Sequence, residues 1–224
     1  MQKLSNKSKY GSTKTHAMSI IGTVLLNKGY EPSFVAGILG NIYYEGSIGK
    51  FESSNYVSHP NLKPTYLKLM DQNYDYRNKY SGKCVTDVSM KELKKLMEKL
   101  KSNNFEKGKF GLGCIQWTGG RTYNLVQVYL QECNNADRIT LDQATAAEGK
   151  MVVKELSGFY KYIYNQWNNE NSNKKSANAA YNAGSIICRK YEIPANAAQK
   201  AVTRGNLSKE IYNRKKRCFF APIY

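Results

Sequence analysis

Residues that build metal centres or disulfide frameworks are scarce in this chain of 224 residues. It has only two histidines, His16 and His59, and its five cysteines are far apart, with no CxxC or Cys/His spacing. That pattern argues against a zinc site and favours mainly buried free thiols over a disulfide framework. We therefore expect neither a metal nor a cofactor.

Long apolar runs are also missing. No segment approaches the ~18 apolar residues that a membrane-spanning helix needs, so we expect no membrane span. The first residues are polar and lack the apolar centre of a signal peptide. We expect a polar tail at 1–15 and one domain over 16–224. Hydrophobic residues make up 41% of the chain, which is enough for a sizeable core and argues against wholesale disorder.

Acidic residues are half as frequent as basic ones. The 34 Lys and Arg residues against 17 Asp and Glu give a net charge of +17. A surplus of this size indicates an anionic partner. Nucleic acid, an anionic membrane surface and an anionic cell-wall polymer all have the required charge. Because the basic residues are spread along the whole chain, charge alone indicates a class of partner and nothing more.

Helical periodicity dominates the first half of the sequence. Apolar residues keep helical spacing from Met18 to Leu26, and Gly29 is expected to close that segment. Ser33 is expected to cap the next helix, whose apolar stripe consists of Val35, Ile38, Leu39 and Ile42. The loop-rich region 46–64 can hold a short hairpin.

The second half is also expected to be helical. Ser89 with Glu92, and Thr140 with Gln143, form capping-box patterns that each predict the start of a helix. The helix after Thr140 is expected to be long, with an apolar face that extends to Phe159 and Ile163. A polar break is expected at 165–175, followed by helices at 177–188 and 195–217. The sequence predicts a mainly α fold with little sheet.

Glu45 is the acidic residue with the most informative position. If its helix continues for one more turn, Glu45 lies on the stripe of Ile38 and Ile42, directly before Gly46, which can terminate the helix. Apolar surroundings and the negative end of the helix dipole both disfavour an ionised carboxylate there. A general acid for glycoside cleavage needs such an environment. The alternative is a frayed helix end with Glu45 directed into water.

Two segments give the chain a resemblance to the phage-tail lysozyme family. They are GNIYYEGS at 40–47 and FGLGCIQWTGGR at 110–121, which are similar to that family's GN-x-x-x-E and G-x-G-x-x-QW-T-x-x-R segments. Weaker matches follow in the family's order: Leu141-x-Gln143, Glu155-Leu156, Tyr191-Glu192-x-Pro194, and Arg204 ahead of Ile211-Tyr212. The resemblance implies an α+β lysozyme-like fold, with a helical domain and a small loop or hairpin region flanking the active-site cleft. It also implies attack on peptidoglycan glycan strands, with Glu45 as the catalytic acid.

Further residues take roles from the resemblance. Gln116 is implied to line the cleft and can hydrogen-bond an N-acetyl group or a sugar hydroxyl. Trp117 either stacks on a sugar ring or anchors the core. The AYNAG segment at 180–184 is similar to one in lytic transglycosylases, so Tyr181 either lines the cleft or packs between helices. Tyr44 is one of several tyrosines that can offer a platform for a saccharide.

A second carboxylate is left open by the sequence. Hydrolysis by the usual two-carboxylate scheme, for which lysozyme is the type case, places the groups ~5–5.5 Å apart for retention or ~6.5–9.5 Å apart for inversion. Glu52 is the next acid after Glu45 and is the best candidate; otherwise it is a solvated loop residue. If no second acid reaches the cleft, a single glutamate can act as acid and then base, which gives the anhydro product of a lytic transglycosylase.

Three functions follow from these observations. The first is a glycosidase that cuts the β-1,4 bond between N-acetylmuramic acid and N-acetylglucosamine. The others are a non-catalytic wall-binding module of the same fold and a basic nucleic-acid binder, which would gain nothing from an acid at Glu45. We expect the partners to be peptidoglycan, anionic wall polymers and other phage-tail or conjugation-apparatus proteins, and not nucleic acid. The expected place of action is the bacterial cell wall, reached from a virion tail or from outside the cell.

Overall fold

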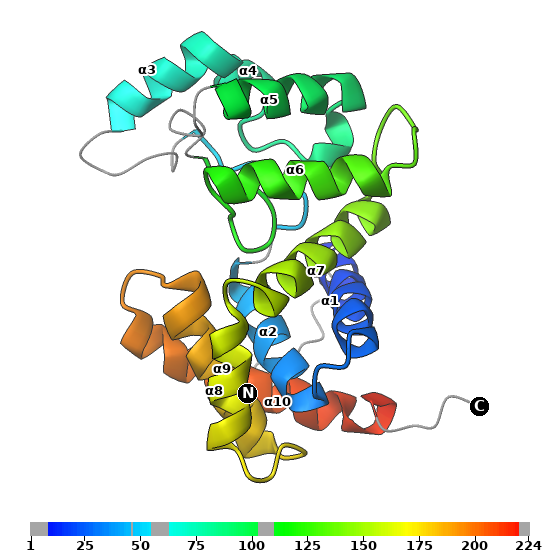
Figure 1. Ribbon diagram of the computed structural model, residues 1–224, viewed down its shortest axis with the longest axis vertical. Coiled ribbons are helices and arrows are strands. Elements are labelled where there is room, and N and C mark those ends of the chain that lie inside the picture. Colours follow the sequence, from blue (N-terminus) through cyan, green and yellow to red (C-terminus); the bar gives the residue numbers. More distant parts are fainter. Residues whose placement is uncertain (1–8, 46, 55–62, 103–109, 220–224) are drawn as a thin grey trace. The chain divides into compact units, whose positions relative to one another are not determined.

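The computed structural model describes residues 9–45, 47–54, 63–102 and 110–219, and helices dominate it (Figure 1). The expected mainly α fold is confirmed. Within these ranges, β pairing is limited to the isolated bridges Lys50–Cys84, Phe51–Leu112 and Leu112–Trp117. No helix in the described ranges is both long enough and apolar enough to cross a membrane.

The chain forms two compact units. Unit 1 contains the residues up to Tyr44 and those from Val152 onward, and unit 2 contains Glu45–Met151. Helix α1 begins at Lys9, within the segment expected as a polar tail. The proposed boundary between that tail and a domain starting at residue 16 stays a prediction.

Unit 1 is built from helices that are distant in the sequence. They are α1 (Lys9–Asn27), most of α2 (Pro32–Glu45), the end of α7 (Leu141–Ser157), α8 (Lys161–Glu170), α9 (Ala177–Ile187), the π turn η2 (Cys188–Glu192) and α10 (Ala197–Phe219). Gly29 closes α1 as predicted: its φ is +91°, and its N–H donates to the carbonyl of Leu26 at 2.8 Å. The Tyr30 N–H reaches back to the Leu25 carbonyl, which completes a Schellman motif.

Two predicted features of unit 1 are wrong. Ser33 does not cap α2, because the helix already begins at Pro32, and the Ser33 hydroxyl donates to the Lys174 carbonyl instead. Proline suits the first helical position since its fixed φ matches the helix and its missing N–H is not needed there. Phe159 does not continue an apolar helix face. It lies in the turn between α7 and α8 and is 84% exposed.

The expected polar break at 165–175 is also shorter than predicted, because α8 continues to Glu170. Its Trp167 is buried, and the indole N–H donates to the Ala179 carbonyl at 2.9 Å. The ring also packs against Phe34 and Tyr164. One buried aromatic residue therefore fixes a segment that its asparagines alone would mark as a loop.

Small residues let the helices of unit 1 approach closely. A Cβ at Gly37 in α2 would lie 2.7 Å from the Ala183 carbonyl carbon in α9. A Cβ at Gly184 would lie 2.8 Å from the Arg204 carbonyl oxygen in α10. The stripe residues Val35, Ile38, Leu39 and Ile42 are all buried, as predicted.

Unit 2 has shorter helices and more irregular backbone. Its elements are α3 (Lys63–Tyr74), α4 (Tyr76–Lys79), the 3₁₀ turn η1 (Val85–Asp87), α5 (Met90–Ser102), α6 (Gly120–Glu132) and the first part of α7. The capping box of α7 is confirmed, since Thr140 and Gln143 exchange hydrogen bonds between side chain and backbone at 2.9 and 3.2 Å. At α5, the Ser89 hydroxyl accepts from the Glu92 N–H at 3.3 Å.

Candidate active site

Glu45 is the last residue of α2, and its side chain is partly buried. This agrees with the expected position at the C-terminus of an apolar helix. Gly46, the proposed terminating glycine, lies outside the described residues, as do residues 55–62 of the region expected to hold a hairpin. That Glu45 faces a groove containing Gln116 stays a prediction.

The segment that follows Glu45 pairs with the glycine-rich segment of the second motif. The Glu52 N–H donates to the Gly111 carbonyl at 2.8 Å, and the Gly111 N–H donates to the Glu52 carboxylate at 2.8 Å. The Gly113 N–H donates to the Lys50 carbonyl at 2.9 Å. Glu52 is therefore a half-buried residue whose carboxylate holds the second motif, and it is not a freely solvated loop acid.

The second motif folds into a tight hairpin. Leu112 and Trp117 exchange two backbone hydrogen bonds of 3.0 Å, and Gln116 occupies the left-handed region with φ of +52°. The Gln116 amide N–H₂ donates to the Gly113 carbonyl at 2.8 Å, and its side chain packs against Gly111. Only glycine leaves room for Gln116 there, because a Cβ at Gly111 would overlap the amide. Glu52 and Gln116 thus both contact Gly111.

Trp117 is 0% exposed, so its ring has no face left for a sugar. Of the two roles considered, the structure supports the core anchor and not the stacking platform. The Trp117 carbonyl also accepts from the Thr122 hydroxyl at 2.6 Å, which fixes the start of α6 against the hairpin. Its contribution to the site is therefore to hold the hairpin that carries Gln116.

Glu148, on α7, is a buried residue that sequence reasoning missed. It is 0% exposed and joins three parts of unit 2. One carboxylate oxygen accepts from the Gly49 N–H and from the Tyr129 hydroxyl, both at 2.6 Å, and the other accepts from the Cys114 N–H at 2.8 Å. A single carboxylate therefore ties the segment after Glu45 to the hairpin and to α6.

Burial raises the pKa of Glu148 above its ordinary value, while hydrogen bonds from Cys114, Tyr129 and Gly49 partly oppose that rise. The pKa of Tyr129 is also raised, first by its own burial and then by the neighbouring Glu148. A sequence signal for Glu148 did exist. An acid in the buried stretch between Ala144 and Met151 of α7 interrupts the apolar face, and buried acids usually have partners.

In unit 1, Asn41 of the first motif and two of the weak later matches, Glu192 and Arg204, form one buried polar network. The Asn41 amide donates to the carbonyls of Gly37 and Gly184 at 2.8 and 3.0 Å. The Arg204 guanidinium donates to the Asn41 carbonyl at 2.7 Å and lies 3.8 Å from the Glu192 carboxylate. Arg204 and Asn41 are both buried. Glu192 and Arg204 therefore help to fix the last turns of α2, the helix that ends in Glu45.

The two tyrosines proposed to bind substrate also belong to unit 1. Tyr44 is 50% exposed, and the Arg204 guanidinium stacks over its ring at 4.8 Å. Tyr181 is half-buried, and its ring leaves no room for a side chain at Gly205 in α10. The small residues around Tyr181 serve helix packing, and the places of Tyr44 and Tyr181 in a cleft stay predictions.

These features define a class of protein. A mainly helical chain in which a helix ends in an acidic residue, followed by a segment paired to a glycine-rich hairpin bearing glutamine, has the features of a lysozyme-like protein. The family model described as phage tail lysozyme matches residues 16–214, and the chain belongs to this family. No curated protein and no solved structure shows a significant match. The chain is thus a phage-associated, lysozyme-like protein that acts on the peptidoglycan of the bacterial cell wall.

Proposed function

We propose that the protein is a muramidase that cuts the β-1,4 bond between N-acetylmuramic acid and N-acetylglucosamine, with Glu45 as the general acid. The observation that carries the proposal is the position of Glu45: it ends α2 with a partly buried side chain, directly before the segment that pairs with the hairpin.

Glu52 is the proposed second carboxylate. Its hydrogen bond from the Gly111 N–H supports this role, because a fixed carboxylate can orient a water molecule or stabilise positive charge that develops on the sugar. Gln116 packs against Gly111 and supplies an amide that can bind an N-acetyl group or a sugar hydroxyl. In this scheme Glu45 protonates the glycosidic oxygen, and the leaving sugar departs as an alcohol. A water molecule then forms the new bond to the anomeric carbon and gives up one proton to a carboxylate of the site, so that water is consumed and Glu45 can be reprotonated.

The partners and setting follow from the same proposal. The substrate is the glycan strand of peptidoglycan, and the charge of +17 favours encounter with anionic wall polymers. We place the protein on a virion tail, where it opens the wall next to other tail proteins. Neither a metal nor a cofactor has a role in this mechanism.

The test is the substitution Glu45→Gln, which keeps size and hydrogen-bonding capacity but removes the transferable proton. Acid catalysis contributes typically ~10²–10⁴-fold, so release of soluble glycan from purified peptidoglycan should fall by at least ~10²-fold. The matched control is Glu98→Gln on the exposed face of α5, which makes the same change in charge and should leave activity unchanged. Undiminished release by Glu45→Gln would falsify Glu45 as the acid.

A further inference from the structure

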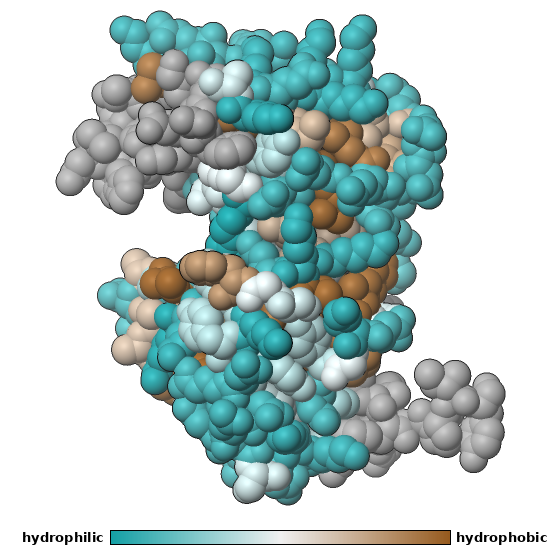
Figure 2. Space-filling model, viewed as in Figure 1, coloured by the Kyte–Doolittle hydropathy of each residue, from teal (hydrophilic) through white to brown (hydrophobic). Residues whose placement is uncertain are grey.

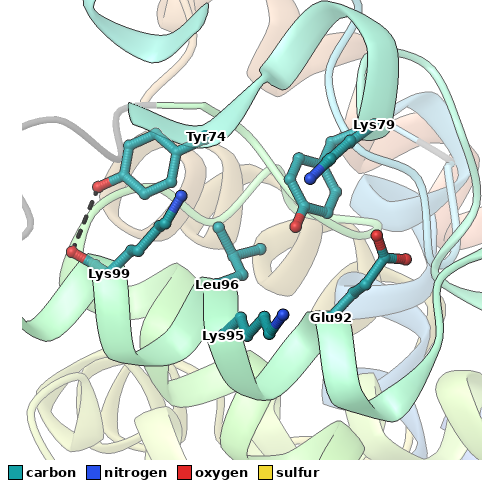
Figure 3. A pocket seen from close by; sticks show the side chains of 7 residues that line it. Tyr74, Lys79, Glu92, Lys95, Leu96 and Lys99 are labelled. Carbon is teal, nitrogen blue, oxygen red and sulfur yellow. Dashed lines mark hydrogen bonds between the residues drawn. The ribbon is translucent and has the colours of Figure 1, made fainter. Parts of the chain in front are cut away.

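A pocket of about 80 Å³ lies in unit 2, between α5 and the end of α3 with α4. Figure 3 shows Lys79 on the α4 side and Lys95, Leu96 and Lys99 on α5. The complete lining is Tyr74, Lys79, Tyr80, Glu92, Lys95, Leu96 and Lys99. None of these residues belongs to the candidate active site.

The lining has three ammonium groups and one carboxylate. The Lys99 ammonium donates to the Asn73 carbonyl at 2.5 Å, which holds it close to the ring of Tyr74. Within the part of the chain that the structure describes, the ammonium groups of Lys79 and Lys95 have no hydrogen-bond or ion-pair partner. Both side chains are exposed. The pocket therefore offers two unpaired positive charges beside a third that is fixed in position.

The floor of the pocket consists of Tyr74, Tyr80 and Leu96. Tyr74, Tyr80 and Leu96 are buried, with 2%, 5% and 1% of their surface exposed. Burial, together with the nearby Glu92 and Asp75, raises the pKa of Tyr80 to about 12, so its hydroxyl stays a neutral hydrogen-bond donor at physiological pH. The pocket combines a buried floor with a rim of hydrogen-bond donors.

We propose that this pocket binds the phosphodiester group of a polyol-phosphate wall polymer. The ammonium groups of Lys79, Lys95 and Lys99 are point charges, and lysine binds phosphate oxygens in this way. The Glu92 carboxylate can accept hydrogen bonds from hydroxyls of the polyol on either side of the phosphate. This inference goes beyond the proposed cleavage and does not depend on Glu45.

The lining favours a polyol phosphate over a nucleic acid. Single-stranded nucleic acids are held by aromatic rings on which the bases stack. The rings of Tyr74 and Tyr80 are almost wholly buried and offer no open face for a base. The Glu92 carboxylate can accept a hydrogen bond from a free hydroxyl of the polyol, and the backbone of DNA lacks such a hydroxyl.

The surroundings of the pocket suit a polymer. Figure 2 shows mostly hydrophilic residues over α3, α4 and α5, which a hydrated polymer can contact without covering an apolar surface. Such a contact would keep the protein on the wall between cleavage events, because a second attachment raises the effective concentration of the substrate.

The test compares two double variants with the same loss of charge. Lys79→Gln with Lys95→Gln removes the unpaired pocket charges, and Lys91→Gln with Lys94→Gln removes two exposed charges elsewhere on α5. The probe is fluorescently labelled poly(glycerol phosphate), and its Kd is measured by anisotropy at constant salt. We expect at least about 10-fold weaker binding for the pocket variant and a change of less than about threefold for the control.

Two further measurements complete the test: binding of single-stranded DNA and cleavage of peptidoglycan without the polymer. If the pocket variant and the control variant lost the same affinity for poly(glycerol phosphate), the pocket would not be the binding site. The proposal would also be overturned if the pocket variant lost as much affinity for single-stranded DNA with the same number of phosphates as for poly(glycerol phosphate). Cleavage of peptidoglycan stripped of its polymer should be unchanged in both variants. That measurement separates a failure of this inference from a failure of the proposed muramidase activity.

Discussion

The two units of the molecule are stabilised in different ways. Unit 1 packs long helices through small residues such as Gly37 and Ala183, and its buried polar groups fix the end of α2. Unit 2 holds irregular segments through backbone hydrogen bonds and the carboxylate of Glu148. The difference shows that the helix bearing Glu45 is positioned by close helix packing together with side-chain hydrogen bonds near its end, whereas the segments bearing Glu52 and Gln116 are positioned mainly by hydrogen bonds to the backbone.

The largest effect on stability is expected in unit 2, from Glu148→Gln. The amide N–H₂ must face a backbone N–H of Gly49 or Cys114, which leaves a buried donor unpaired and costs roughly 2–4 kcal/mol of unfolding free energy. Tyr129→Phe is the graded control, since it removes one donor and should cost about 1 kcal/mol. Urea unfolding measures both, and equal costs for the two variants would contradict the role of Glu148 as the common acceptor.

Unit 1 should respond to added volume instead. Gly37→Ala places a Cβ against the backbone of α9, and we expect a loss of roughly 1–3 kcal/mol of unfolding free energy. Gly22→Ala in α1 is the matched control. The nearest side chain there is Leu39 at 3.4 Å, so the higher helix propensity of alanine should leave stability unchanged or raised. If thermal unfolding shows similar effects for both, close helix contact is not what stabilises unit 1.

Glu52→Gln separates catalysis from support in unit 2. Its amide oxygen can still accept from the Gly111 N–H, so the hairpin should persist and thermal stability should change little. Turnover on peptidoglycan should fall by about 10-fold, equivalent to ~1.4 kcal/mol, because the carboxylate charge is gone. Binding to insoluble wall serves as the internal control and should be near normal. Unchanged turnover would contradict a catalytic role for Glu52 and would show that its carboxylate serves only to hold Gly111.

The smallest effect is a pH dependence carried by Glu148. Its pKa in the folded state is raised by burial above the ordinary value of 4.5, so its contribution to stability is fully present below pH 4.5. That contribution is lost as the pH rises through the folded-state pKa. The unfolding free energy of the native protein should therefore fall relative to that of Glu148→Gln as the pH rises above 4.5. If the unfolding free energy of the native protein instead rose relative to that of Glu148→Gln as the pH increased, the hydrogen bonds to the carboxylate would outweigh the cost of burying it.

Much of the helical fold could be predicted from local sequence. Gly29 and the Thr140–Gln143 capping box fix helix ends through contacts within a few residues, so the local sequence is enough to locate these ends. The prediction that Ser33 caps α2 was wrong because Pro32, one residue earlier, is also a local signal for the start of a helix, and the helix begins there. Residues 165–170 were mistaken for a loop because the buried contacts of Trp167 are with distant helices.

The candidate site was only partly predictable for the same reason. Glu45 carries a local signal, since it continues the stripe of α2. Glu148 carries a local signal too, since it interrupts the apolar face of α7, but its partners Gly49 and Cys114 are far away in the sequence and contribute backbone N–H groups that no side-chain pattern marks. The role of Glu52 in holding Gly111 likewise depends on backbone pairing between two irregular segments.

The most direct test of the central claim is the mass of the products. Purified peptidoglycan is incubated with the native protein and with Glu45→Gln, and the released muropeptides are weighed by mass spectrometry. We expect muropeptides with hydrated, reducing N-acetylmuramic acid ends from the native protein and at least ~10²-fold less of them from the variant. Anhydro ends, lighter by one water, would contradict hydrolysis with Glu52 as second carboxylate. The absence of any product from the native protein would contradict the glycosidase itself.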